Sequence, residues 1–563
     1  MRRLIRFGVI IGAGALAAGC SAGAGSTASP GSSSTGKAVT TASSTLTIDN
    51  ENGALWTCDF NPFNTADNLL SVGFTYEPLV YVDPLDNGKT TPMLATSWAW
   101  SNGNKTLTFQ IRQGVKFSNG TAMTASDVAG TFNLLKKDSA LDLNGIWSVL
   151  SSVTATSPST VVMDFSTLAT PYFYYIADQT PIVPQSIWST LPNPASNPVT
   201  DPIGTGPYVM SKCSPENITY TANPDYWQPG LPKIHTLEYP AYTSNNTAND
   251  DLANGQAQWG AQYIPDIQTF YVSKNPGYHY WFPPTVSVSL IPNLTNPLLS
   301  NVKVREAISY AINRTQVSSI GESGYEPAAN QTGIVTPTFT ADESSTALAA
   351  WGNGYDPAKA TQLLKQAGYH LGSNGVMVNS AGQQLSFTVL NIGDYSDWVA
   401  DMQVMQQELK AVGISITPDN LSNTDFNTEL TQGKYQLAYY DQPTFGPSPW
   451  YELNNWLNSA DTAPIGKTAP SNYERYNSAS TDAILTQYEA ATSASQQQSL
   501  LDELQQVMVT QVPFIPVVEA VDWYQYDTSA FTGWPTASNP YAQPPAWAYP
   551  DNEQVLLHLA PAG

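Results

Sequence analysis

Alternating apolar and polar residues predict a strand over residues 106–111. Apolar Leu, Phe and Ile alternate there with Thr and Gln, the period of a strand that has one buried face. The pair Asn102-Gly103 precedes it as a turn. A second, shorter strand is predicted over residues 115–117, because Gln113-Gly114 and Asn119-Gly120 bracket it with the positive φ that Gly accepts in tight turns.

Two further stretches have the pattern of helices. Thr124 is a predicted N-cap with a carboxylate, Asp127, at the third helical position, and the helix is predicted to run to about Lys137. Between residues 302 and 313, apolar residues recur every three or four positions. That spacing places them on one face of a helix.

Local end signals define two more helices. Asp356 is a predicted N-cap before Pro357 at the first helical position, and Gly368 is the predicted stop. A further helix is predicted over residues 401–410, ended by Gly413.

The segment from Trp98 to Val128, which holds the first strand, the turns and the capped helix, resembles the signature segment of a known family. The family is the bacterial extracellular solute-binding proteins, family 5, which are the oligopeptide, dipeptide, nickel and oligosaccharide receptors of ABC importers. Other segments resemble the family in its own order, at residues 46–48, 60–63, 76–81, 203–208 (I-G-T-G-P-Y), 223–230, 302–313, 355–368, 401–413 and 512–516.

The resemblance implies an α/β fold of the two-lobed, periplasmic-binding-protein type II-like kind, with a hinge and an extra domain (cluster C-like). Lobe I is expected to take residues 45–76, 200–286 and 517–563, the extra domain residues 77–199, and lobe III residues 287–516. The signature segment then lies in the extra domain. It is a marker of the fold and not a ligand site.

The N-terminus is predicted to be a lipoprotein signal, residues 1–20. Three Arg residues precede a short apolar run that ends in L-A-A-G-Cys20. About a dozen apolar residues are too few to span a bilayer of about 30 Å. Residues 21–44 are rich in Gly, Ser and Thr and are predicted to be a flexible tether. We therefore expect a protein lipidated at Cys20 and held at the extracytoplasmic face of the cell membrane.

Composition excludes one class of partner. The 45 acidic and 22 basic residues give a net charge of −23, which repels polyanions, so no nucleic-acid partner is expected.

About 520 residues remain after the signal and tether. A single hydrophobic core does not hold so many residues, so at least two lobes are predicted. Only 12% of residues are charged. The expected partners are a solute and the permease subunits of an ABC importer, and the protein is expected to be a monomer.

Neither a metal site nor a cofactor is predicted. The chain has no CxxC motif, and its four histidines are far apart in sequence. Once Cys20 carries lipid, Cys58 and Cys213 remain. Both are expected in lobe I of an exported protein, where they would form a disulfide or stay as two buried thiols.

The solute is predicted from the segment of residues 435–450. Peptide receptors of the family commonly hold the peptide amino terminus with an Asp in a W-x-A-D-Y segment. Here Asp441 lacks both the preceding Ala and the following Tyr. The 15 Trp and 30 Tyr residues, several of them near amides, suit a sugar, whose C–H faces stack on rings and whose hydroxyls need paired donors and acceptors.

A neutral, β-linked oligosaccharide is therefore the predicted solute, with a peptide as the alternative. The C-terminal segment 531–541 also resembles members of the family that bind β-linked gluco-oligosaccharides. The candidate ligand-binding residues are Trp56, Asn61, Asn64, Trp259, Tyr263, Asp394, Trp398, Tyr440, Asp441, Phe445, Trp450 and Trp534.

No catalytic motif occurs in the sequence context that it requires. No H-E-x-x-H element occurs, and the matches to G-x-S-x-G (residues 19–23) and S-x-x-K (residues 34–37 and 300–303) lie in the predicted signal and tether or at the start of a predicted helix, without the strand or partner motifs that such nucleophile sites need. The protein is predicted not to be an enzyme. A secreted glycan hydrolase remains an alternative, because two carboxylates brought together only by folding leave no sequence pattern.

Overall fold

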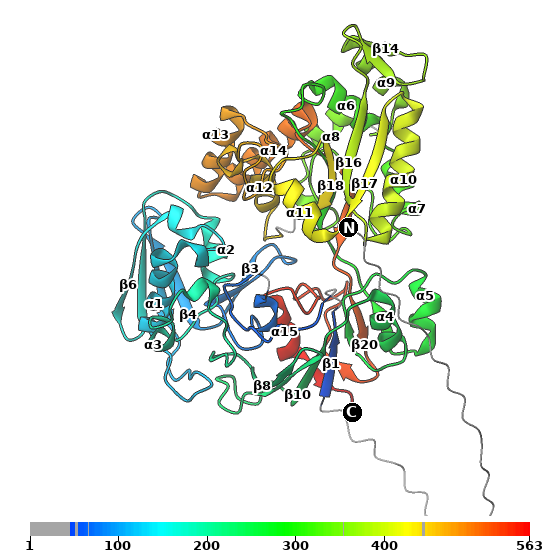
Figure 1. Ribbon diagram of the computed structural model, residues 1–563. Coiled ribbons are helices and arrows are strands. Elements are labelled where there is room, and N and C mark those ends of the chain that lie inside the picture. The colour runs from blue at the N-terminus through cyan, green and yellow to red at the C-terminus, as the bar shows by residue number, and fades with distance from the viewer. Residues whose placement is uncertain (1–44, 51–53, 66, 353, 442–444) are drawn as a thin grey trace, which may run out of the picture. The chain divides into compact units, whose positions relative to one another are not determined.

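The structure is a computed structural model that describes residues 45–50, 54–65, 67–352, 354–441 and 445–563. The predicted signal, the tether and Cys20 lie outside these residues. The described chain forms three larger sheets with their helices (Figure 1). The prediction of an α/β fold is confirmed.

The first sheet has seven strands in the order β12-β20-β11-β1-β10-β9-β8, and β1 is parallel to both of its neighbours. Its strands are β1 Thr45–Asp49, β8 Tyr208–Ser214, β9 Asn217–Ala222, β10 Thr236–Pro240, β11 Trp259–Gly260, β12 Tyr278–Tyr280 and β20 Gln525–Asp527. The neighbouring elements in sequence are α4 Asn245–Ala253, α5 Ile267–Phe270, β21 Phe531–Thr532, α15 Asp551–His558 and β22 Ala560–Pro561.

A disulfide joins Cys58 to Cys213 on β8. It links two of the segments that the sequence assigned to lobe I, which are 155 residues apart. Of the two states left open for this pair, the structure contains the bonded one.

The second sheet has five strands in the order β17-β16-β18-β13-β19. They are β13 Pro284–Pro292, β16 Ser386–Ile392, β17 Ser415–Leu421, β18 Leu437–Asp441 and β19 Ile515–Val521. The elements that accompany this sheet in sequence are α6 Val302–Ala311, α7 Arg314–Ile320, α8 Ser345–Trp351, α9 Pro357–Gln366, β14 Tyr369–Leu371, β15 Met377–Asn379, α10 Ser396–Ala411, α11 Asn423–Thr431, α12 Trp450–Leu457, α13 Ala479–Ala490 and α14 Ala494–Gln511.

The predicted helices of this part are present. In α9 the Asp356 carboxylate accepts from the Lys359 amide at 2.8 Å, and Gly368 has a φ of +89° after the helix end. Helix α10 begins at Ser396, five residues before the predicted start. The earlier start follows from Asp397 in the first turn, a position that suits a carboxylate beside free backbone amides.

The third sheet has the order β4-β5-β7-β6 and holds the signature segment. Its strands are β4 Ala95–Ser101, β5 Thr106–Ile111, β6 Leu150–Ser157 and β7 Thr160–Phe165. The same part of the chain holds α1 Ala125–Lys137, α2 Tyr172–Ala177, α3 Gln185–Trp188 and a separate two-stranded sheet of β2 Val80–Asp83 and β3 Lys89–Pro92. Strand β5 has the predicted bounds, and Thr124 and Asp127 form the predicted capping box. The strand predicted over residues 115–117 is wrong. Only one isolated bridge, Lys116 to Ala122, forms there because the two turns leave no room for a ladder.

The chain passes between the seven-stranded and five-stranded sheets at two adjacent segments. The Trp281 amide donates to the Tyr524 carbonyl at 3.1 Å, and the Asp522 amide donates to the Pro283 carbonyl at 2.9 Å. Strand β13 begins at Pro284 and strand β19 ends at Val521, so the crossings lie just before β13 and just after β19.

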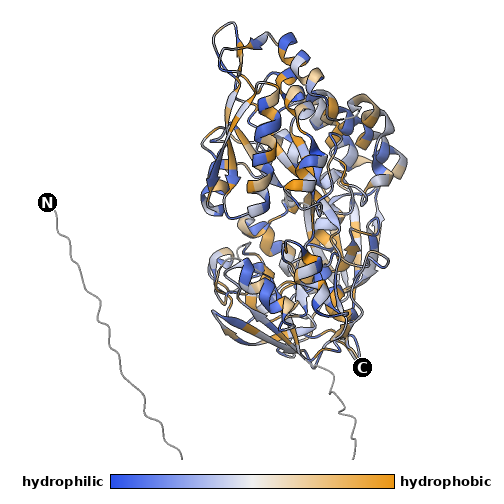
Figure 2. Cartoon of the chain, turned by 90° about the vertical axis from the view of Figure 1, so that its right-hand side faces the viewer, coloured by the Kyte–Doolittle hydropathy of each residue, from blue (hydrophilic) through white to orange (hydrophobic). Residues whose placement is uncertain are grey.

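The helices on the outside carry both hydrophilic and hydrophobic residues along their length (Figure 2). Among the helices of the described residues, none is both long and apolar enough to cross a bilayer.

Candidate solute-binding site

Four tryptophans predicted to stack on a solute are core residues instead. Trp56, Trp259, Trp450 and Trp534 are at most 5% exposed. The indole N–H groups of three of them donate to backbone carbonyls: Trp56 to Tyr239 at 2.8 Å, Trp259 to Pro544 at 2.8 Å, and Trp534 to Phe531 at 3.0 Å. Trp450 stacks on Tyr488 with ring centroids 5.6 Å apart. The prediction is corrected for all four, because their ring faces are buried inside the protein.

Asn61 and Asn64 are also used by the protein itself. The Asn61 amide nitrogen donates to the carbonyls of Pro194 and Asn197 at 2.8 and 3.1 Å, and its oxygen accepts from the Phe63 amide. Asn64 donates to the Asp67 carboxylate at 2.6 Å. Asn61 is 1% exposed, so its predicted contact with a solute is corrected as well.

Other predicted residues do gather at the end of β18. Trp398 is itself 5% exposed and packs in the core, so its predicted stacking on a solute is corrected too. Its ring contacts Tyr439 and Tyr440, with ring centroids 5.5 and 6.4 Å apart. Asp441, the last residue of β18, is half-buried. Burial, and then the nearby charge of Asp397, raise the pKa of Asp441 to about 6. Asp394 is exposed and lies two residues before α10, the helix that carries Trp398.

Half-buried aromatic rings cluster at the two chain crossings. Trp523 lies 5.2 Å from Tyr263 and 4.8 Å from Phe282, centroid to centroid, and Phe282 lies 5.7 Å from Tyr325. The Tyr263 hydroxyl lies 3.2 Å from the Ser323 hydroxyl. Tyr263 was predicted from sequence. The other three rings were missed, and only their position beside the expected hinge could have indicated them.

A cavity of about 420 Å³ lies where three parts of the chain meet. Residues 62–72 and 543–549 come from the part with the seven-stranded sheet, residues 135–144 and 174–181 from the extra domain, and Phe445 from the part with the five-stranded sheet. Its volume is within the range of about 300 to 1,000 Å³ that is typical of small-molecule sites. Phe445 was a predicted site residue.

The cavity lining combines aromatic rings with amide groups and one carboxylate. Trp547, which is 43% exposed, is the most accessible of its rings. Amide groups of Asn68, Gln179 and Gln543 line it as well, and among the described lining residues there is no Lys, Arg or His. The one lining carboxylate, Asp142, accepts from the backbone amides of Ile146 and Trp147, each at 2.9 Å.

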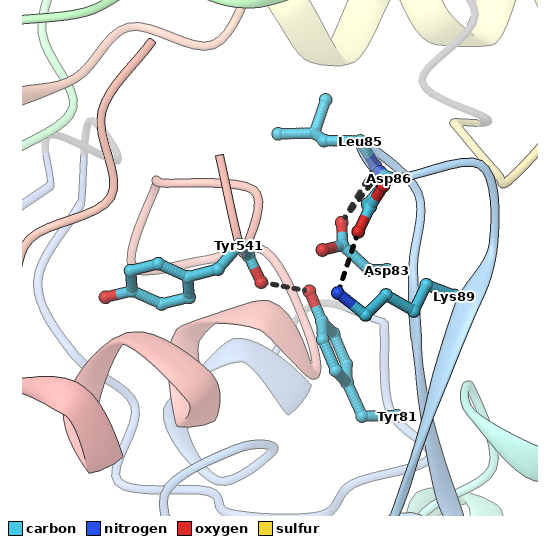
Figure 3. A network of polar contacts seen from close by, with 6 residues as sticks. All are labelled: Tyr81, Asp83, Leu85, Asp86, Lys89 and Tyr541. Atoms are coloured by element: carbon cyan, nitrogen blue, oxygen red, sulfur yellow. Dashed lines mark hydrogen bonds and ion pairs between the residues drawn. The ribbon is translucent and has the colours of Figure 1, made fainter. Parts of the chain in front are cut away.

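The segment that carries Trp547 is held in place by buried polar contacts. The Tyr81 hydroxyl lies 3.0 Å from the Tyr541 carbonyl (Figure 3). It also lies 2.8 Å from the Asp551 carboxylate. The same carboxylate oxygen accepts from the Gln543 amide at 2.7 Å. Both ends of residues 541–551 are therefore tied to β2 of the extra domain.

No group of three or more His, Cys, Asp or Glu side chains within the described ranges is arranged to hold a metal ion. The donors around the cavity are amides and hydroxyls, which suit hydrogen bonding to a polar organic molecule.

Residues 89–464 match the bacterial extracellular solute-binding proteins, family 5. The chain belongs to this family. The sequence resemblance to family 5 is thus confirmed, and the chain is a solute-binding receptor of an ABC importer that works outside the cytoplasm. The family is non-catalytic, so the glycan hydrolase alternative is wrong.

Relatives of this family 5 receptor bind chemically different solutes. The glutathione-binding protein GsiB of Escherichia coli (strain K12) is 27% identical over 459 residues, which cover 76% of this chain and 80% of that protein. An oligopeptide ABC transporter periplasmic protein of Thermotoga maritima superposes with a TM-score of 0.85 at 23% identity, over 92% of this chain and 99% of that one.

Two other solved structures carry ligands. The mannohexaose-bound form of the Thermotoga maritima protein has a TM-score of 0.81 at 23% identity, covering 92% of this chain and 98% of that one. AppA of Bacillus subtilis, in complex with a nonapeptide, has a TM-score of 0.75 at 19% identity, covering 93% and 100%. These likenesses show that the family 5 receptor has the cluster C fold.

Proposed function

We propose that this receptor captures a neutral oligosaccharide, β-linked, in the cavity and delivers it to the permease of an ABC importer. The observation that carries the proposal is the cavity lining: an exposed Trp547 face beside amides and hydroxyls, without a cationic side chain among the described lining residues. A relative of the same fold is described with mannohexaose.

The lining favours a sugar over a peptide on physical grounds. A peptide brings a carboxylate at one end, and burying that charge without a cation costs several kcal/mol. The Asp142 carboxylate is already occupied by backbone amides, so it offers little to a peptide ammonium. A pyranose needs only ring faces and paired hydroxyl contacts.

Replacement of Trp547 by Ala tests the proposal. We expect cellobiose or a longer β-oligosaccharide to bind the parent protein, and Trp547→Ala to weaken binding by about ten- to a hundredfold, because stacking area is lost. Isothermal titration calorimetry measures both affinities. Trp100→Ala, which removes a partly buried ring on β4 that packs on Phe165, is the matched control and should bind as the parent does.

A peptide remains the second candidate because two carboxylates, Asp397 and Asp441, lie close enough to interact at the end of β18. A peptide ammonium held there would bind less tightly as salt concentration rises, whereas a neutral sugar would hardly respond. Salt-sensitive peptide binding that Asp441→Asn abolishes, with no heat from any oligosaccharide, contradicts the sugar proposal and supports the peptide one.

Cys20 is proposed as the lipid anchor that keeps the receptor at the extracytoplasmic face of the membrane, where a monomer would meet the permease. The apolar run that ends at Cys20 and the polar tract after it support this. Fractionation of cells that express Cys20→Ala should move the protein from the membrane to the soluble fraction. Full membrane retention of Cys20→Ala contradicts the anchor.

A further inference from the structure

Two buried carboxyl groups lie next to each other close to residues 543–549, the segment that forms one wall of the cavity. Glu77, which precedes β2, and Glu553, in α15, are both 0% exposed. The Tyr226 hydroxyl oxygen lies 3.0 Å from Glu77 Oε1 and 3.2 Å from Glu553 Oε1. Trp227 Nε1 donates to the same Glu77 oxygen at 2.9 Å. The Oε2 atoms of both acids are buried without a hydrogen-bond partner among the described residues.

The hydrogen atoms at this junction can be counted. A Tyr hydroxyl carries one proton, so Tyr226 donates to one acid only. Gln228 Nε2, 3.2 Å from the Tyr226 oxygen, is itself a donor. The second acid therefore makes a favourable contact only if it carries its own proton, because two oxygens without a hydrogen between them repel.

One cation, Arg112, lies near the pair and interacts with the charge of Glu77. Its guanidinium stacks 4.1 Å over the Trp227 ring and its Nε donates to the Met93 carbonyl. A single cation can balance one carboxylate but not two. The other titratable groups that face the pair, Asp178, Tyr226 and Tyr549, supply no positive charge. Burial raises the pKa of Glu77, and burial followed by repulsion from Glu77 raises the pKa of Glu553.

The pair is connected to the cavity through α15. Tyr549 lines the cavity, and its buried hydroxyl, which has no hydrogen-bond partner among the described residues, is affected by the charges of Glu553, Asp178 and Glu77. Two residues before Glu553, Asp551 holds the Gln543 amide of the same wall. A change of charge at the pair therefore acts on the segment that presents Trp547.

We propose that Glu77 and Glu553 form a shared-proton site, and that solute capture in the cavity is linked to this proton. With the proton present the wall is held together. Its loss places two carboxylates side by side, which pushes α15 away from Glu77 and loosens the wall. The choice of sugar as solute rests on the proposed function; the proton site itself does not.

Glu553→Gln tests the site, because the amide keeps the shape and a permanent hydrogen. Glu216→Gln, at an exposed position of the same part of the chain, is the control. Without solute, the free energy of unfolding is measured from thermal melts between about pH 4 and about pH 9. Its slope against pH should be smaller by one proton in Glu553→Gln than in the parent. With solute, the parent should lose affinity by up to about tenfold per pH unit once the pair titrates, and Glu553→Gln should not.

The outcomes separate the two proposals. Equal solute-free slopes for Glu553→Gln, Glu77→Gln and the parent would overturn the shared proton. A reduced slope in the variants with pH-independent sugar affinity in the parent would overturn the link to capture. If no sugar binds, a pH-dependent fluorescence of Trp547, taken as the difference between the parent and Trp547→Phe and lost in Glu553→Gln, supports the proton-linked wall and rejects only the proposed solute.

Discussion

At the scale of single residues, contacts far apart in sequence decide what each aromatic and acidic side chain does. Tyr81 is the clearest case, because its hydroxyl connects β2 to the segment 541–551 that forms part of the cavity. Tyr81→Phe should lower the free energy of unfolding by about 1.5 to 3 kcal/mol, since Asp551 loses a buried donor. Urea unfolding measures the change.

The matched control for this prediction is Tyr355→Phe. Tyr355 is 43% exposed, and removal of its hydroxyl should leave the free energy of unfolding unchanged. A Tyr81→Phe protein as stable as the control would mean that Asp551 does not depend on the hydroxyl.

At the scale of elements, the disulfide ties Cys58, in the segment between β1 and β2, to Cys213 on β8. Closing a loop of 155 residues contributes about 4 to 5 kcal/mol in the chain-entropy model. The Cys58→Ser/Cys213→Ser protein should therefore unfold at a lower temperature, with a loss of that order. Calorimetry measures it, and alkylation of the denatured, unreduced parent should find no free thiol at either position.

At the scale of the whole molecule, acidic groups are buried without cations to pair with. Two ion pairs, Lys89–Asp86 and Lys116–Asp225, form among the described residues, and both are exposed. Burial is the first cause of a raised pKa at many carboxyls: about 6 for Asp83, about 7 for Glu452 and about 8 for Glu519. Each of these groups binds a proton more tightly in the folded than in the unfolded protein.

Stability should therefore fall as pH rises. Because the folded pKa values lie above the unfolded ones, these groups contribute stability that is fully present below about pH 4 and is lost as pH rises through about 6 to 8. Each proton released on unfolding contributes a slope of about 1.4 kcal/mol per pH unit. Thermal melting between about pH 4 and about pH 8 checks it, and a melting temperature that rises over this range contradicts the prediction.

The sequence alone determined the family, the α/β class and several local elements of this protein. Strand β5, the capping box of α1 and both ends of α9 follow from period, caps and glycine, which act within a few residues. The tertiary structure decided which rings are buried and which are exposed. Trp259 and Trp547 are the same type of residue, yet Trp259 is buried and Trp547 is exposed. Burial depends on segments hundreds of residues apart meeting in space, as do the cavity, the disulfide and the Glu77–Glu553 pair, and no local pattern encodes those distances.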